Sequence, residues 1–248
     1  MLTLLYTIWC GCWLIFIYLV LFPVQYVLLQ REAWKPLAHR INRLWGRLFF
    51  GIIGMPVDVD YRFRPDPRGV YVFVANHFSY LDIAVMGVIL DNYYAFVGKS
   101  GVKHVPLLGY MFAKLHVQVD RDHANSRAYS LAKSLRLLAS GRSIMIFPEG
   151  GIRSKQPPKM AYPFKDGAFI MAIQQQVPIV PITLVNNHDI LPDKAKIRMH
   201  RRRLRAIVHP PIDTRGLTQA DLNRLKEETY QIIDRALCPD LRQAHAGR

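Results

Sequence analysis

Cysteine is scarce in this chain, which contains three cysteines among 248 residues. Cys10 and Cys12 lie within an apolar segment, and Cys238 is close to the end of the chain. A disulfide framework needs several paired cysteines, and a structural zinc site needs Cys and His ligands at paired spacings. The sequence therefore excludes both classes, predicts no metal site and favours a reducing compartment.

Charge is missing from the first 30 residues, since the first charged side chain is Arg31. About 20 apolar residues cross a bilayer core, so residues 2–22 are long enough to do so. A cleaved signal peptide would need early basic residues and a small-residue cleavage site, which residues 23–26 do not supply. We therefore expect a retained membrane segment. Pro23 is expected to kink or end the helix, so a half-inserted hairpin is an alternative to a full span.

Acidic residues are also few, with 18 Asp and Glu against 33 Lys and Arg, so the net charge is +15. Such a chain attracts polyanions: nucleic acid, an anionic membrane surface or an acidic carrier. The densest basic stretch, residues 194–205, lacks the interleaved aromatic side chains that stack on bases. We expect no nucleic-acid partner, and a charged hairpin there that is attracted to anionic lipid or to an acidic carrier.

A second helix is predicted between residues 34 and 53. Its cations are Lys35, Arg40, Arg43 and Arg47, and its apolar stripe at helical spacing consists of Trp34, Leu37, Ile41, Leu44, Trp45, Leu48 and Ile52. A basic amphipathic helix with tryptophan on its apolar side is typical of a membrane interface, but a helix packed on the domain core would show the same pattern. Basic residues that follow an apolar segment mark the cytoplasmic side of a membrane.

The rest of the chain alternates short apolar strands with helical stretches. The predicted strands lie near residues 70–75, 94–98, 116–120, 143–147 and 179–185, and the helices near 80–90, 126–140 and 165–176. The remaining predicted elements are a strand at 58–63, a hairpin of 197–200 and 204–208, and a last helix at 219–237. This pattern favours an α/β fold with a mixed, mostly parallel sheet flanked by helices. We expect a membrane anchor with its basic amphipathic helix over residues 1–55 and an α/β domain over residues 56–248.

A histidine and an aspartate follow the predicted strand at 70–75. In α/β sheets functional groups gather where strands end, and His77 and Asp82 lie there. A histidine can take a proton from an alcohol, and an aspartate bonded to its other ring nitrogen fixes the tautomer. The structural alternative is that Ser79 and Asp82 form a capping box, which would only begin the following helix.

A second predicted strand ends in the segment FPEGGIR, which contains Glu149, two glycines and Arg153. Glycines allow a ligand to approach the backbone closely, and arginine binds phosphate through paired hydrogen bonds. A surface loop would have the same composition, so this segment by itself is weak evidence for a phosphate site.

Taken together, the motifs resemble those of glycerophospholipid acyltransferases. Residues 76–82 match the N-H-x-x-x-x-D motif of that family, and residues 147–150 match its F-P-E-G motif. The other motifs of the family are matched, in the same order along the chain, by Gly98-Lys99 and by residues 106–109, 117–121 and 177–182. The resemblance covers residues 70–190 and is closest to bacterial 1-acyl-glycerol-3-phosphate acyltransferases.

The resemblance implies a reaction and a set of site residues. His77 would be the general base on the acceptor's free hydroxyl, supported by Asp82, with acyl-CoA or acyl-carrier protein as donor. No covalent acyl-enzyme, metal or cofactor would be required. The acceptor would be a lysophospholipid, most closely 1-acyl-glycerol 3-phosphate, which yields phosphatidate at the cytoplasmic face of the cell membrane. The residues implied in substrate binding are Lys99, Arg121, Glu149, Gly150, Gly151 and Arg153. Glu149 is itself an anion and would position the arginines or the loop.

One departure from the family pattern leaves the acceptor open. The common block is E-G-T-R-S, whereas here Arg153 comes four residues after Glu149 and the threonine is absent. Alternative acceptors are a lyso-ornithine-type lipid, another lysophospholipid or glycerol 3-phosphate. A non-catalytic, membrane-anchored basic binding protein is a further alternative, against which the pair His77 and Asp82 and the F-P-E-G motif both argue.

Overall fold

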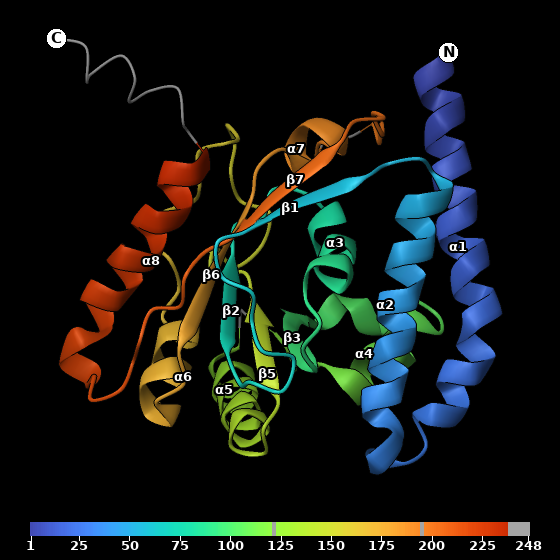
Figure 1. Cartoon of the computed structure of the whole chain (residues 1–248). Helices are drawn as coiled ribbons and strands as arrows, with labels where there is room; N and C mark the ends of the chain where they lie inside the picture. The colour runs from blue at the N-terminus through green and yellow to red at the C-terminus, as the bar shows by residue number, and fades with distance from the viewer. Residues whose placement is uncertain (121–122, 194–195, 238–248) are drawn as a thin grey trace, which may run out of the picture.

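A seven-stranded sheet forms the centre of the protein (Figure 1). The computed structural model describes residues 1–120, 123–193 and 196–237. The sheet has the order β1-β7-β6-β2-β5-β3-β4. Its strands are β1 (Val57–Tyr61), β2 (Val72–Ala75), β3 (Tyr94–Lys99), β4 (Val117–Val119), β5 (Ser143–Ile146), β6 (Ile179–Leu184) and β7 (Leu204–Val208). Neighbouring strands are parallel except for β6 and β7, so the prediction of a mixed, mostly parallel sheet is confirmed.

Helices cover both faces of this sheet (Figure 1). One face packs on residues of α1, α2, α3 and α4, and the other packs on α5, α6 and α8. The helices are α1 (Leu2–Leu28), α2 (Lys35–Ile52), α3 (Leu81–Ile89), α4 (Leu108–Leu115), α5 (Ala124–Ala139), α6 (Gly167–Gln175), α7 (Asn187–Ile190) and α8 (Leu222–Leu237). The capping box predicted at Thr218 and Asp221 is present, in a 3₁₀ turn that leads into α8. The sequence patterns did not predict α4 or α7.

The hairpin predicted near residue 200 is wrong. Residues 197–200 form no strand, and β7 pairs in parallel with β1 and antiparallel with β6 instead. The backbone N–H of Met199 donates to the hydroxyl of Thr7 on α1, 3.0 Å away, rather than to a neighbouring strand. The basic segment is therefore held against the N-terminal helix, and residues 194–195 lie outside the described residues.

The first two helices lie side by side and antiparallel (Figure 1). Helix α1 continues past Pro23 to Leu28, so of the two effects expected of this proline, a kink or an end, the helix end does not occur there. Beyond the proline, Gln25 donates to the side chain of Asn42 on α2 at 2.6 Å, and this contact holds the last turn in place. Among the described residues, α1 is the one helix long and apolar enough to cross a membrane, by length and composition.

Helix α2 packs on the sheet with a face that the sequence pattern did not mark. Its buried residues include Ala38, Phe49 and Phe50, whereas Leu37 and Leu44 of the predicted apolar stripe are exposed. Phe49 and Phe50 share one core cluster with α1 residues and with sheet residues. The anchor and the α/β domain therefore have a common core, which confirms the interpretation of α2 as a helix packed on the domain core, while its position at a membrane interface stays a prediction.

Candidate active site

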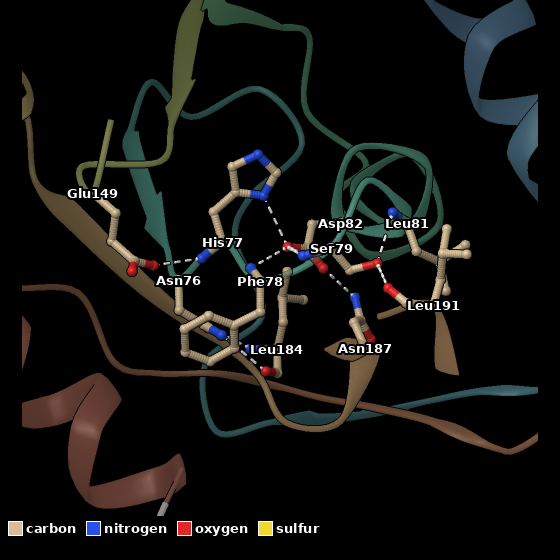
Figure 2. Close-up of polar contacts among 10 residues, drawn as sticks. All are labelled: Asn76, His77, Phe78, Ser79, Leu81, Asp82, Glu149, Leu184, Asn187 and Leu191. Carbon is tan, nitrogen blue, oxygen red and sulfur yellow. Dashed lines mark hydrogen bonds and ion pairs between the residues drawn. The ribbon is translucent and has the colours of Figure 1, made fainter. Parts of the chain in front are cut away.

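Asn76 ends the strand that leads into the site. Its side-chain amide donates to the carbonyl of Leu184 at 2.9 Å, and its oxygen accepts the N–H of Leu184 at 2.8 Å (Figure 2). The side chain thus continues the pairing of β2 with β6 one residue beyond Ala75, where the backbone turns away from the sheet. The motif contained this asparagine, but its role becomes visible only in the pairing of two distant strands.

His77 and Asp82 are in contact. Nδ1 of His77 lies 2.9 Å from Oδ2 of Asp82, and the same oxygen accepts the backbone N–H groups of Phe78 at 2.8 Å and Ser79 at 2.9 Å (Figure 2). The carboxylate therefore organises the turn before α3 and also binds the histidine. The predicted capping box is only half formed, because Asp82 accepts the N–H of Ser79 whereas the Ser79 hydroxyl accepts the N–H of Leu81 at 3.2 Å instead of that of Asp82.

The imidazole of His77 has one nitrogen available for a substrate. Its ring stacks on Phe147, with centroids 4.2 Å apart and planes 16° from parallel. Its side chain is 11% exposed, whereas Asp82 is fully buried. Within the part of the chain that the structure describes, Nε2 of His77 makes no hydrogen bond. Because an ionised Asp82 accepts the Nδ1 proton, Nε2 carries the lone pair and can act as a base.

Asn187 is a site residue that the sequence analysis missed. It lies on α7, and its amide nitrogen donates to Oδ1 of Asp82 at 2.7 Å (Figure 2). The two residues are 105 positions apart, and α7 was not predicted, so no local pattern connects them.

Glu149 holds the backbone of the site together. One of its carboxylate oxygens accepts the N–H of His77 at 2.7 Å, and the other accepts the N–H of Ala161 at 2.8 Å. Burial raises the pKa of the Glu149 carboxyl to about 7, although both N–H groups and the neighbouring imidazole oppose this rise. The contacts of Glu149 are with loop backbone, in line with the expectation that it positions the loop.

A cleft of about 500 Å³ opens between α5 and α6 at the carboxyl ends of β3, β4 and β5. Arg153 and Lys165 contribute cationic groups to it. Phe147 lines the cleft and also stacks on the imidazole of His77, so the cleft lies next to this histidine. Apolar side chains line much of the rest: Val97, Val119, Leu131, Ile146 and Met171. The cleft can accommodate an anionic group next to a hydrocarbon chain.

Only some of the residues predicted to bind the phosphate line the cleft. Gly150 and Arg153 line the cleft, as does Lys165, to which the sequence analysis assigned no role. Lys99 is exposed at the end of β3 and is not part of the lining. Arg121 lies outside the described residues.

The glycine pair explains how the altered loop is built. Gly150 has φ +81° and Gly151 has φ +141°, which are backbone conformations that favour glycine. A threonine at position 151 would be strained there, so this loop follows its own path rather than that of E-G-T-R-S. Along this path Arg153 still reaches the cleft.

No group of three or more His, Cys, Asp or Glu side chains that could hold a metal ion occurs in residues 1–120, 123–193 and 196–237.

The model of the acyltransferase family matches residues 60–185. The chain belongs to this acyltransferase family. The matched region includes His77, Asp82, Glu149 and Arg153, so the site described above lies within it.

Named relatives share much of this chain. It is 35% identical over 142 residues to the chloroplastic 1-acyl-sn-glycerol-3-phosphate acyltransferase BAT2 of Brassica napus, across 57% of this chain and 40% of that protein. It is 32% identical over 187 residues to an uncharacterised acyltransferase of Schizosaccharomyces pombe, across 72% and 66%. It is 28% identical over 202 residues to the 1-acyl-sn-glycerol-3-phosphate acyltransferase of Saccharomyces cerevisiae, across 79% and 66%. The chain thus spans 40% to 66% of the length of these eukaryotic relatives.

The fold matches a solved structure. The crystal structure of the 1-acyl-sn-glycerophosphate (LPA) acyltransferase PlsC from Thermotoga maritima superposes with a TM-score of 0.76 at 20% sequence identity. The match covers 95% of this chain and 94% of that chain, which confirms the α/β fold preceded by N-terminal helices.

Proposed function

We propose that this acyltransferase transfers a fatty acyl group from a thioester donor to the free hydroxyl of 1-acyl-glycerol 3-phosphate, which yields phosphatidate. The observation that carries the proposal is the contact between His77 and Asp82, with Nε2 of His77 unoccupied by the described residues and a cationic, apolar-lined cleft beside it. The printed names of the Brassica and Saccharomyces relatives support the same acceptor.

In the proposed mechanism, Nε2 of His77 removes the proton from the acceptor hydroxyl as its oxygen attacks the thioester carbonyl. Asp82 stabilises the imidazolium that forms. The tetrahedral intermediate then collapses, the carbon–sulfur bond breaks, and the imidazolium returns the proton to the thiolate. The acyl group passes directly from acyl-CoA or acyl-carrier protein to the acceptor, so the step needs neither an acyl-enzyme nor a cofactor.

The phosphate of the acceptor would bind to Arg153 and Lys165 at the mouth of the cleft, and its acyl chain would lie on the apolar lining. This arrangement favours a phosphate-bearing acceptor over a lyso-ornithine-type lipid. Glycerol 3-phosphate would leave the apolar lining unused. Lys99 and Arg121 remain predicted contacts to the phosphate, outside the lining and outside the described residues respectively.

The N-terminal helices support a position at the cytoplasmic face of the cell membrane. Helix α1 exposes large apolar side chains along its length, including Leu5, Phe16 and Val20. It packs along α2, which carries Arg40 and Arg47 and is itself packed on the sheet. A perpendicular span would draw these charges into the hydrocarbon, so we place α1 half-inserted in one leaflet.

The proposal is tested with the full-length chain in detergent, by thiol release from palmitoyl-CoA and by product analysis. We expect phosphatidate from lysophosphatidate, and a rate at least about 10²-fold lower for His77→Ala, as for loss of a general base. Full activity of His77→Ala would overturn the mechanism.

The acceptor is tested separately. Arg153→Gln and Lys165→Gln should raise KM for lysophosphatidate but not for palmitoyl-CoA. Lys155→Gln is the control, because Lys155 is an exposed lysine of the same loop that does not line the cleft. A wild-type preference for a lyso-ornithine-type lipid or for glycerol 3-phosphate would show that the acceptor is wrong.

A further inference from the structure

Helix α7 brings a buried amide to the catalytic carboxylate. Asn187 is 2% exposed, and its Nδ2 lies 2.7 Å from Oδ1 of the fully buried Asp82. Within the described residues, Oδ1 accepts this one hydrogen bond. Oδ2, on the other side of the carboxylate, accepts three N–H groups.

We propose that Asn187 is a positioning residue for acyl transfer, which keeps Asp82 ionised and turned so that Oδ2 faces Nδ1 of His77. The inference rests on the proposed function, because it concerns the same histidine and aspartate. Asn187 touches no reacting atom and acts on the reaction through Asp82.

The hydrogen-bond inventory of Asp82 supports this role. An ionised carboxylate accepts hydrogen bonds but donates none, and four donors surround this one. Without the amide, Oδ1 would be a buried anionic oxygen with no partner, which favours proton uptake by the carboxyl. A protonated or rotated Asp82 no longer accepts the Nδ1 proton of His77, and Nε2 then loses its defined lone pair.

The negative charge of the Asp82 carboxylate also decides which way the Asn187 amide is turned. The opposite flip would place the Asn187 oxygen against the carboxylate, two acceptors facing each other in a buried site. In the orientation present, the Asn187 oxygen is buried and has no partner among the described residues. The residue satisfies Asp82 and leaves its own oxygen unpaired, which is costly for a residue with a purely structural role.

Other contacts hold α7 in place without Asn187. The adjacent Asn186 donates to the carbonyl of Arg203 at 2.9 Å and accepts the N–H of Arg205 at 3.0 Å. Beyond the helix, the carbonyl of Leu191 accepts the hydroxyl of Ser79 at 2.8 Å. Removal of the Asn187 side chain should therefore leave α7 on the sheet, and Asn186 is a matched control with contacts only to the backbone of the β7 segment.

Ionisable side chains reach this region from three elements. His77 follows β2, Glu149 follows β5, and His188 lies on α7 with its ring against Phe78. Asn187 is the neutral donor among them, and an acid in its place would put a second carboxyl group against Asp82.

The test compares Asn187→Ala, Asn187→Asp and Asn186→Ala in acyl transfer across pH. Loss of a hydrogen bond to a charged group should lower kcat of Asn187→Ala by about 10- to 100-fold. KM for lysophosphatidate should stay unchanged, and the acid limb of the kcat profile should move to higher pH, because a carboxylate without the Asn187 amide takes up a proton more readily. Asn187→Asp should lose more activity than Asn187→Ala, because a second carboxyl group against Asp82 forces the two groups to share a proton.

Two outcomes would overturn the inference. If Asn187→Ala keeps the wild-type kcat and pH profile while His77→Ala is inactive, the inference is wrong and the proposed function stands. Equal losses in Asn187→Ala and Asn186→Ala without a change of pH profile would show a structural role only. Thermal unfolding of all three variants identifies any that fail to fold, and Asn187→Ser then replaces Asn187→Ala.

A measurement without substrate separates this inference from the proposed function. If the wild-type chain does not acylate lysophosphatidate, ¹⁵N chemical shifts of His77 still report its tautomer. We expect the proton on Nδ1 in the wild type and a mixture of tautomers in Asn187→Ala. Identical spectra of the two proteins would overturn the inference.

Discussion

Oδ2 of Asp82 lies 2.9 Å from Nδ1 of His77 and also accepts the N–H groups of the two residues that follow this histidine. One oxygen atom thus sets both the tautomer of His77, the proposed base, and the backbone path that carries it. Damage to this carboxylate should therefore impair catalysis and local folding together.

Asp82→Asn should lower kcat by about 10³- to 10⁴-fold, because the amide no longer selects the reactive tautomer of the histidine. It should also lower the melting temperature, since an asparagine NH₂ group facing Phe78 and Ser79 leaves buried N–H groups without an acceptor. Asp91→Asn is the control, because Asp91 is a surface aspartate paired with Arg43 and Arg47. An Asp82→Asn variant with more than a tenth of wild-type kcat would contradict the role assigned to the carboxylate.

Phe147→Leu should separate packing from catalysis. Phe147 is 7% exposed and stacks on the imidazole of His77, so leucine fills part of the volume but removes the flat surface. We expect a modest loss of unfolding free energy and a kcat lower by up to about 10-fold, because a ring pair contributes about 0.5–1.5 kcal/mol. Phe169→Leu, at a buried site on the α6 side of the sheet, should cost similar stability with kcat unchanged. Equal kcat for both variants would show that the stack does not position His77.

Glu149 should make stability depend on pH. Burial raises its pKa to about 7, above the ordinary 4.5, so between these values the folded chain holds a proton that the unfolded chain releases. Stability should therefore fall as pH rises from about 5 to about 7, by up to about 1.4 kcal/mol per pH unit, and then level off. Urea unfolding of wild type and Glu149→Gln at pH 5, 6, 7 and 8 tests this. The difference between the two proteins should change over this range, and parallel curves would contradict the prediction.

His39 should make the folded chain less stable as the pH falls, which is the opposite direction to the effect of Glu149. It is 3% exposed on α2, both ring nitrogens lack partners among the described residues, and its ring packs edge-on against Tyr94. Burial and the neighbouring Arg142 and Arg43 lower its pKa to about 3, so the unfolded chain binds a proton that the folded chain does not. Stability should therefore be lost as pH falls from about 6.5 towards 3. His39→Phe should resist this loss in urea unfolding, whereas the exposed His104→Asn should follow the wild type. A His39→Phe variant with the wild-type acid dependence would refute the prediction.

Patterns within a few residues were predicted well, because they depend on local geometry. The strands at 72–75 and 143–146 follow from apolar runs, and the pairing of His77 with Asp82 follows from a spacing that one turn can close. Helix α2 shows the limit of such patterns. Its existence was predictable, but the buried face contains Ala38, which packs against α4, and Phe49, which shares a core cluster with the sheet, rather than the marked stripe with Leu37. Which of two apolar faces is buried depends on the partner that each face meets.

The sequence by itself determined the α/β class, the apolar N-terminal helix, the contact of His77 with Asp82 and the family, since each rests on residue type and short spacing. Only the tertiary structure decided that Asn76 pairs with Leu184, that Lys165 shares a cleft with Arg153 and that Asn187 reaches Asp82. The physical reason is that the order of strands in the sheet brings distant segments together. That order is set by burial and hydrogen bonding summed over the whole chain, which no single segment records.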